Sequence, residues 1–286
     1  MNFLVKKALL SDIGQRARIN QDAVLLKTAR SERFGRICFA LICDGLGGLS
    51  HGEVASSAVS GRMEKWFTGD LTRLIAGAGK AHLDAGQCLH RIRLMWQNIV
   101  LEMNETLAQK GQEKGIRMGT TVVAFLLLGQ QYLIMHVGDS RLYITRSGML
   151  ELLTHDHSLV QKKQDAGILT PRQALLSESG SVLLQCIGAS HVVRPDFRSG
   201  TLFENTSVLL CTDGFWRKLQ TDEILNGILP DHQSDETTMR ETVRTLADRT
   251  KARGEVDNIS VIFLTLIAEN AMPAIAPLSL QQAMVC

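Results

Sequence analysis

The segment ICDGLGGLSHGE, residues 42–53, contains the feature that decides what this chain is expected to be. An apolar run, Phe39 to Cys43, ends directly at Asp44, and two groups of glycines follow before a helix is expected to begin. A single aspartate in such a place is usually a turn residue or a helix cap. Whether Asp44 is more than that depends on how the other apolar runs of the chain end.

The composition bounds the class of protein. The chain has 286 residues, a formal net charge of +2 and 45% hydrophobic residues, which suits one large domain or two small ones with a sizeable core. The near-neutral charge, without a basic stripe, argues against nucleic acid as a partner. No apolar run is long enough for a signal peptide or a membrane helix, so we expect no association with a membrane.

The six cysteines favour an intracellular protein. None belongs to a CxxC pair, which disfavours zinc, and those in apolar runs are expected to pack as small buried hydrophobes: Cys38, Cys43 and Cys211. A reducing environment fits this pattern, so the expected location is cytoplasmic.

Short segments rich in apolar and β-branched residues predict many antiparallel strands. The stretch 120–154 is expected to form a meander with turns at 129–130, 138–139 and 147–148, because short turns favour antiparallel pairing. The expected strands are 22–28, 36–43, 120–128, 131–138, 140–145, 206–212 and 258–266.

Three segments show helical periodicity, namely 51–67, 87–108 and 234–251. Ser50 and Glu53 have the spacing of a capping box, which predicts that the first helix begins there. Because the helices cluster after the first strands and near the C-terminus, with strands between them, the pattern predicts an α+β protein whose helices cover a sandwich of sheets.

The domain is expected to span residues 1–267. Within it, residues 155–200 are less regular and are interpreted as an excursion, or flap, that lies beside the site. Residues 268–286 are expected to be a loosely attached C-terminal extension.

Four other aspartates lie at the ends of apolar strands, as Asp44 does: Asp22, Asp139, Asp213 and Asp257. Strand ends that converge on one edge would bring carboxylates together, and like charges so placed repel and need a cation. All-oxygen ligands favour hard ions such as Mg²⁺ or Mn²⁺. Glycine after Asp44 lets the backbone approach closely and leaves the Gly45 carbonyl free to face a metal.

Three motifs that would indicate other functions are absent from the sequence. Gly45 and Gly47 are followed by Ser50 where a GxGxxG nucleotide loop requires its third glycine. The phosphate-loop pattern GxxxxGK[ST] is absent from the chain, and so is the GxSxG elbow of serine hydrolases.

Seven blocks, in order and at the expected spacing, resemble the metal-dependent serine/threonine protein phosphatases (the type 2C-like, or PPM, family) in their compact bacterial form. The resemblance covers the chain from about Ser11 to Leu266. The blocks are SDIGQRARINQDA, CDGLGGLSHGEVAS, MGTTVV, HVGDSRLY, LTHDHSLVQ with AGILT, LLCTDGFW and DNISVIFL.

The resemblance implies a four-layer αββα sandwich with two central antiparallel sheets and a pair of Mn²⁺ or Mg²⁺ ions at one end. Asp44 would bridge both ions, the Gly45 carbonyl would bind one of them, and Asp139 would hold a third, weaker ion. The other metal ligands implied are Asp22, Asp213 and Asp257. Supporting roles fall to Asn258, which would orient Asp257, and to Thr120 and Thr121, which would shape the site.

The activity implied is hydrolysis of phosphoserine and phosphothreonine in proteins by a hydroxide that the metal pair activates. Asp44, Asp213 and Asp257 would carry the catalysis, so no protein nucleophile is needed. The expected partners are phosphorylated proteins and the pathway of a bacterial serine/threonine kinase that the phosphatase opposes. We expect a monomer.

One position departs from the family pattern. The family usually carries a phosphate-binding arginine five residues before the aspartate that matches Asp22, and here that position is Ala17. Arg16 and Arg18 flank it. On an extended chain both would face away from the side of Ala17, so a local bulge would be needed to turn either one inward. Arg18 is the favoured substitute because it lies nearer Asp22.

Two other functions compete with an active phosphatase. Ala17 suits a weak or inactive member that serves as a regulatory binding module on the same fold, whereas the five aspartates favour activity. A nuclease with a carboxylate-bound metal pair is the third alternative, and the near-neutral charge counts against it.

Overall fold

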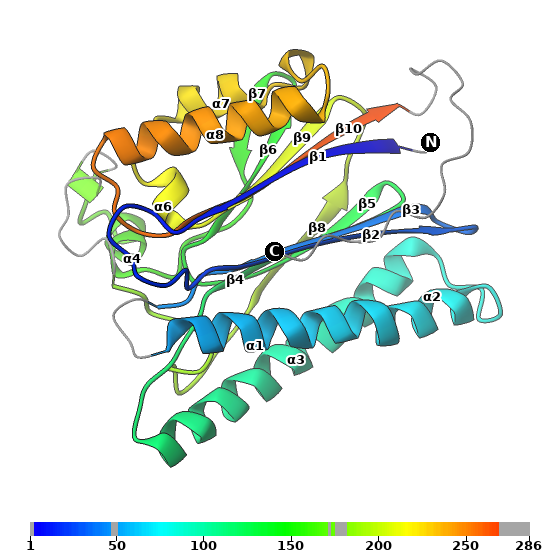
Figure 1. The fold of residues 1–286 in the computed structure, drawn as a ribbon. Helices are drawn as coiled ribbons and strands as arrows, with labels where there is room; N and C mark the ends of the chain where they lie inside the picture. Colours follow the sequence, from blue (N-terminus) through cyan, green and yellow to red (C-terminus); the bar gives the residue numbers. More distant parts are fainter. Residues whose placement is uncertain (1–2, 47–50, 171–172, 175–181, 269–286) are drawn as a thin grey trace.

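Two five-stranded antiparallel sheets form the centre of the molecule (Figure 1). The computed structural model describes residues 3–46, 51–170, 173–174 and 182–268. Sheet A contains, in spatial order, β1 (Phe3–Asp12), β10 (Ile259–Ala268), β9 (Thr206–Cys211), β6 (Arg141–Arg146) and β7 (Met149–Leu152). Sheet B contains β2 (Ala23–Ser31), β3 (Gly35–Cys43), β4 (Val122–Leu128), β5 (Gln131–Val137) and β8 (Asp196–Thr201).

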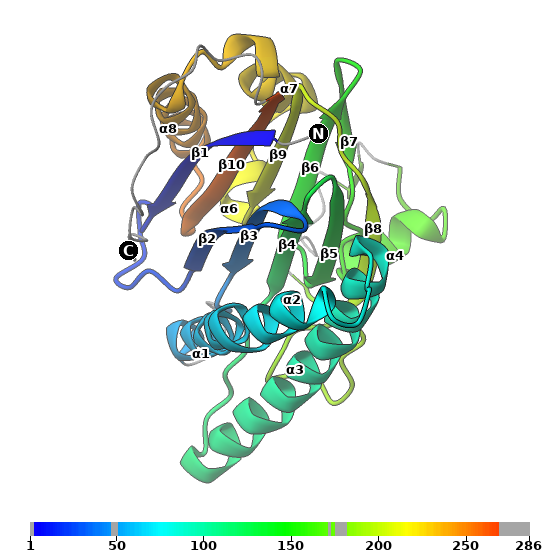
Figure 2. The same ribbon diagram turned by 90° about the vertical axis from the view of Figure 1, so that its right-hand side faces the viewer.

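Helices cover the outer face of each sheet (Figures 1 and 2). Sheet B lies against one continuous helical stretch and a longer helix: α1 (Gly52–Lys65), the π-helical turn η1 (Trp66–Leu71), α2 (Thr72–Ala78) and α3 (Ala85–Lys114). Sheet A lies against α7 (Thr221–Ile228) and α8 (Glu236–Ala252). Short helices complete the described part: α4 (Leu159–Asp165), α6 (Asp213–Trp216) and η3 (Pro230–His232). The predicted αββα sandwich of an α+β protein is confirmed.

Strand β3 shows why its sequence is a continuous apolar run. Phe39 and Leu41 pack toward the helices, where the Phe39 ring lies 5.4 Å from that of Trp66 and 5.8 Å from that of Trp96. Ala40 and other residues on the opposite face pack toward sheet A. Because side chains alternate along a strand, a central strand covered on both faces must be apolar at every position. Within the described residues, no helix is both long and apolar enough to cross a membrane.

The apolar patterns locate most elements, and three details of the prediction are wrong. The stretch 120–154 is not one meander, because β5 belongs to sheet B and β6 to sheet A. The turn at Gly138 and Asp139 is therefore the place where the chain passes from one sheet to the other. Gly138 makes this possible with φ +112°, a conformation that residues with side chains rarely adopt.

The second and third corrections concern a strand and a helix start. The last residues of the expected excursion 155–200 belong to β8, an edge strand of sheet B. Helix α1 begins at Gly52 with His51 as its N-cap in a left-handed conformation, and no side chain caps it. Glu53 accepts a hydrogen bond from Gln21 Nε2 at 3.3 Å. Residues 47–50, including Ser50, and the extension from 269 onward lie outside the described residues.

Candidate metal centre

The two sheets bring the strand ends that carry the five aspartates to one end of the sandwich. Strands β3, β5 and β9 end there, and β2 and β10 begin there. In Figure 1 this is the end at which α4 and α6 lie. A cavity of about 770 Å³ opens here and has four of the carboxylates in its wall: Asp44, Asp139, Asp213 and Asp257. Asp22 lies beside them, where Thr212 Oγ1 donates to its Oδ2 at 3.3 Å.

Asp44 is held by the segment that begins β4. Its backbone N–H donates to Thr121 Oγ1 at 3.1 Å, and its carbonyl accepts from Thr121 N at 2.8 Å and from Thr120 Oγ1 at 2.8 Å. Both threonines are fully buried. Since the backbone of Asp44 has all its partners here, its carboxylate is left to face the cavity. The two threonines therefore hold the backbone of Asp44 in place.

The glycines that follow two of the aspartates allow close backbone contacts. A Cβ at Gly45 would lie 2.5 Å from the Gln21 carbonyl oxygen, and one at Gly214 would lie 2.2 Å from the Asn258 carbonyl oxygen. Both distances are shorter than any real contact, so only glycine fits. The first contact holds the end of β3 against the segment before β2 in sheet B, and the second holds the segment after β9 against the start of β10 in sheet A.

Asp213 begins the short helix α6 and is 8% exposed. Its Oδ2 accepts a hydrogen bond from Arg217 Nη2, four residues further along. Its Oδ1 is buried and has no hydrogen-bond partner within the described residues. A buried carboxylate oxygen without a donor is unfavourable, so this atom calls for a cation or a water.

The shifts in pKa report how crowded these carboxylates are. Burial first, and then the charges of Asp213 and Asp257, raise the pKa of Asp22 to about 7. Burial and the neighbouring aspartates raise the pKa of Asp44 well above its ordinary value, and burial with Asp213 does the same for Asp139. Like charges in a buried group favour protonation unless a cation compensates them.

Among the described residues, Arg217 is the cation that forms an ion pair with one of these five carboxylates. Although burial opposes its charge, the carboxylates of Asp213, Asp139 and Glu255 raise its pKa. One guanidinium cannot balance five carboxylates. The donor set that remains is all oxygen, which fits a hard divalent ion such as Mn²⁺ or Mg²⁺.

Asn258 ties the start of β10 to the segment before β2. Its side chain accepts from Gln21 N at 2.8 Å and donates to the Ile13 carbonyl at 2.8 Å, while its backbone N–H donates to Asp257 Oδ1 at 2.8 Å. The side chain therefore fixes the loop that leads to Asp22, and the backbone orients Asp257.

The arginines are arranged differently from the sequence expectation. Arg16 and Arg18 are both exposed, and neither is among the described residues that line the cavity. Arg117 does line it, and its Nη2 makes one long hydrogen bond, 3.4 Å, to the Ala189 carbonyl. Sequence reasoning missed Arg117 because it searched only the segment before Asp22. The available signal was its place directly before the MGTT block.

The rest of the cavity wall is mainly apolar and, apart from Leu46 after β3, comes from the segment between α4 and β8. It comprises Leu46, Leu183, Leu184, Cys186, Ala189, Ser190, His191 and Val192. Cys43 and Cys211, which lie next to the aspartates, are fully buried, and burial raises the pKa of both thiols. Neither is suited to act as a nucleophile.

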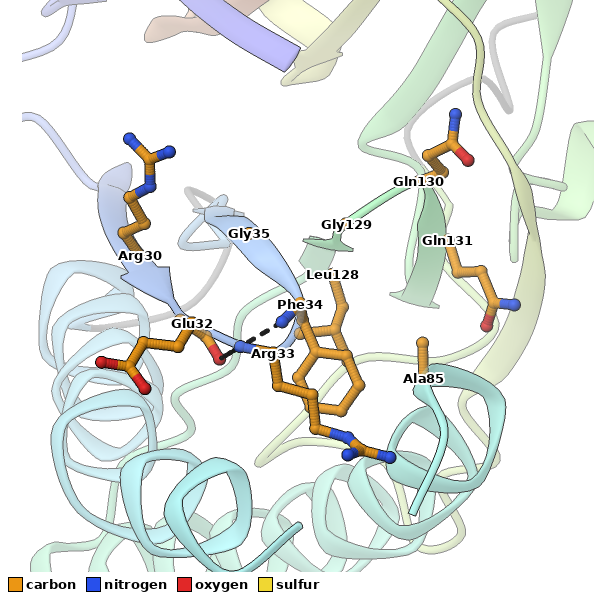
Figure 3. Close-up of a pocket in the computed structure, with 11 residues that line it drawn as sticks. Arg30, Glu32, Arg33, Phe34, Gly35, Ala85, Leu128, Gly129, Gln130 and Gln131 are labelled. Carbon is orange, nitrogen blue, oxygen red and sulfur yellow. Dashed lines mark hydrogen bonds between the residues drawn. The ribbon is translucent and has the colours of Figure 1, made fainter. Parts of the chain in front are cut away.

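A second cavity, of about 850 Å³, lies at the opposite end of sheet B (Figure 3). It is formed by the β2–β3 and β4–β5 turns, with Arg33, Phe34 and Gln131 among its lining residues. Arg33 donates to the Leu83 carbonyl at 3.0 Å and lies over the Phe34 ring. This cavity contains none of the five aspartates, so its size alone does not make it the site.

Comparisons with known proteins agree with this arrangement. The family model for protein phosphatase 2C matches residues 14–257. The protein phosphatase PhpP of Streptococcus pneumoniae is 28% identical over 266 residues, which cover 92% of this chain and 98% of that protein.

Solved structures show the same fold. The Streptococcus agalactiae serine/threonine phosphatase is 28% identical, with a TM-score of 0.72 over 92% of this chain and 99% of that one. The catalytic domain of the serine threonine protein phosphatase PstP, solved in complex with two manganese ions, is 26% identical, with a TM-score of 0.71 over 93% of this chain and 100% of that one.

Proposed function

The chain belongs to the protein phosphatase 2C family and is a phosphatase of that class, and we propose that it removes phosphate from phosphoserine and phosphothreonine in proteins with Mn²⁺ or Mg²⁺ ions as cofactors. The observation that carries this proposal is the group of buried carboxylates in the wall of an open cavity, with too few protein cations to balance them. The PstP domain, which is similar over nearly the whole chain, was solved with manganese.

The ligands proposed for the core pair of ions are Asp44, the Gly45 carbonyl, Asp22, Asp213 and Asp257, directly or through water. Ions bound there would supply an acidified water and positive charge for the phosphoryl oxygens. Asp139 is proposed to hold a third ion, since it lies in the same cavity wall but on the turn between the two sheets.

The chain itself contributes rigidity and a cation. Thr120 and Thr121 fix the backbone of Asp44, and Asn258 fixes the segment that leads to Asp22. Arg117 is the exposed guanidinium on the cavity wall, so we propose that it binds the phosphate or an acidic residue of the substrate by charge-assisted hydrogen bonds. The sequence prediction that Arg18 does so stays open to the same test.

Apolar side chains on the wall favour a peptide over a small, fully polar substrate. Leu184 is 45% exposed and Val192 is 63% exposed, and both belong to the segment expected to act as a flap. We propose phosphorylated proteins as substrates and the pathway of a serine/threonine kinase as the setting, with the enzyme acting as a monomer in the cytoplasm. The free, buried thiols support a reducing location.

The test is hydrolysis of a phosphothreonine peptide by the full chain with Mn²⁺, Mg²⁺ or a chelator. We expect turnover with either ion, none with chelator, and recovery when Mn²⁺ is added back. Turnover that persists in chelator would refute the metal part of the proposal. A protein that binds the ions but leaves phosphopeptides intact would support the regulatory binding module instead.

A further inference from the structure

A second group of metal-binding side chains lies outside the aspartate cluster. His136, His157 and Asp196 each offer a ligand atom, and these atoms all lie within 4.8 Å of one another. The rings of the two histidines are 4.9 Å apart between centroids, and His157 Nε2 lies 3.1 Å from Asp196 Oδ2. None of the three belongs to the proposed phosphatase centre.

The fold brings these residues together from three separate segments. His136 is the next-to-last residue of β5 and faces the space between the sheets, on the same side as Ile134. Asp196 begins β8 directly opposite His136, so both side chains emerge on one face of the sheet. His157 approaches from the loop before α4, and its backbone N–H donates to the Gly138 carbonyl at 2.7 Å.

His136 shows that the group is incomplete as it stands. The side chain is 1% exposed, and neither ring nitrogen has a hydrogen-bond partner within the described residues. Burial, and then the neighbouring His157, lower the pKa of His136 to about 3, while the Ser140 backbone acts in the opposite direction. The ring is therefore neutral, and a neutral imidazole is the form that binds metals.

We propose that His136, His157 and Asp196 bind a divalent transition-metal ion of the zinc or cobalt type. Two imidazoles and a carboxylate form a ligand set typical of such ions, and three protein ligands leave a position for water. Asp196 is 60% exposed, which gives the ion a route in from solvent. The nearby Arg141 is paired with Asp156 at 2.7 Å, so its charge is already compensated.

Binding has a consequence for the turn that carries Asp139. In the metal-free protein Gly138 N–H donates to His157 Nδ1 at 3.3 Å, so the proton of the ring is on Nε2 and points to Asp196. A metal on Nε2 takes the place of that proton, which moves to Nδ1. The Gly138 amide then loses its acceptor, and ion binding is transmitted to the residue next to Asp139.

The test is a Co²⁺ titration of the full chain with Mg²⁺ in excess, followed by visible absorption. Mg²⁺ occupies the all-oxygen cluster, whereas Co²⁺ bound to imidazole gives an intense band typical of low coordination. We expect this band to reach its full intensity when one Co²⁺ ion is bound per chain. Asp196→Ala, a change at an exposed position, should weaken Co²⁺ binding by at least about tenfold. His136→Gln should remove the band.

The chain offers a matched control. His155 Nε2 and Asp165 Oδ2 form an exposed pair 2.9 Å apart, and no third ligand joins them among the residues that the structure describes. Asp165→Ala should leave the Co²⁺ band unchanged. The proposal is refuted if wild-type protein gives no band in excess Mg²⁺, or if the band survives Asp196→Ala at full affinity. Because the readout is a spectrum, a failure here says nothing about the phosphatase activity, and the reverse also holds.

Discussion

Charged side chains lie at both ends of sheet B, but they are exposed to solvent at one end and buried at the other. At the start of β3, Glu32 and Arg33 are exposed, and Arg33 satisfies the Leu83 carbonyl. At the end of β3, Asp44 faces the same cavity as Asp139 and Asp213, which are 4% and 8% exposed. Solvent screens charges at the first end, whereas burial leaves the second end short of positive charge. The two cavities are similar in size, about 850 and 770 Å³, so chemistry rather than volume separates them.

The largest effect should come from removing one buried carboxylate. Asp44→Asn keeps the shape of the side chain and removes a metal ligand. Loss of a residue that only hydrogen-bonds to a metal ligand typically costs roughly 10- to 100-fold in activity, so loss of the ligand itself should reduce phosphopeptide turnover by more than that. The melting temperature without metal should be kept or should rise, because the backbone bonds of Asp44 to Thr120 and Thr121 do not change and one crowded carboxylate is removed. Glu32→Gln at the opposite end is the control and should have no effect on turnover. An equal loss of turnover in Asp44→Asn and Glu32→Gln would contradict the proposed difference between the two ends of the sheet.

The second prediction separates the arginines. Arg117→Ala should raise the KM for a phosphothreonine peptide by roughly 10- to 100-fold, because charge-assisted hydrogen bonds contribute about 1.5–3 kcal/mol. Arg33→Ala at the far end should leave KM unchanged. Arg18→Ala is the variant that the sequence singles out. If Arg18→Ala raises KM strongly while Arg117→Ala leaves KM unchanged, the segment that carries Arg18 moves toward the cavity in solution. That result would overturn the role of Arg117.

The third prediction concerns Asp139. Its place on the turn between the sheets sets it apart from the strand ends that carry the core ligands. Asp139→Asn should lower kcat by about tenfold while the core ions remain bound, as expected for a supporting ion. Metal content measured after gel filtration, together with kcat, tests this. If Asp139→Asn loses all bound Mn²⁺, Asp139 belongs to the core instead.

The smallest effect is a dependence of stability on pH. The pKa of Asp22 is raised from 3.8 to about 7 in the folded, metal-free protein. Between these values the unfolded chain loses a proton that the folded chain keeps, so the free energy of unfolding should decrease as pH rises from about 4 to 7. Melting temperatures in chelator should follow this trend, and saturating Mn²⁺ should remove it. A metal-free protein that gains stability over this range would contradict the crowding of the carboxylates.

Most of the architecture could be predicted from alternation and apolar runs. The buried strands β3, β4, β9 and β10 were found because both faces are covered, which makes the runs continuous. Strands β1 and β8 were missed because they lie at or near sheet edges and carry exposed, polar residues such as Lys7 and Arg198. A sequence also cannot show that β5 and β6 part at Asp139, since a short turn serves either a hairpin or a crossing between sheets.

The site was predictable to the extent that it depends on strand ends. All five aspartates could be named because each adjoins an apolar run. Arg217 and Arg117 could not be found in that way, because neither adjoins an apolar run. Only the fold places Arg217 beside Asp213 and Arg117 on the cavity wall. The His136, His157 and Asp196 group was missed for the same reason, since it is assembled from three distant segments.

The central claim is that the aspartate cluster holds a pair of divalent ions, and the electron paramagnetic resonance spectrum of the Mn²⁺-loaded protein tests it most directly. Two Mn²⁺ ions that share the Asp44 carboxylate should give an exchange-coupled spectrum, and Asp44→Asn should abolish the coupling while the fold is retained. A spectrum of isolated Mn²⁺ ions from fully active wild-type protein, unchanged in Asp44→Asn, would contradict the account.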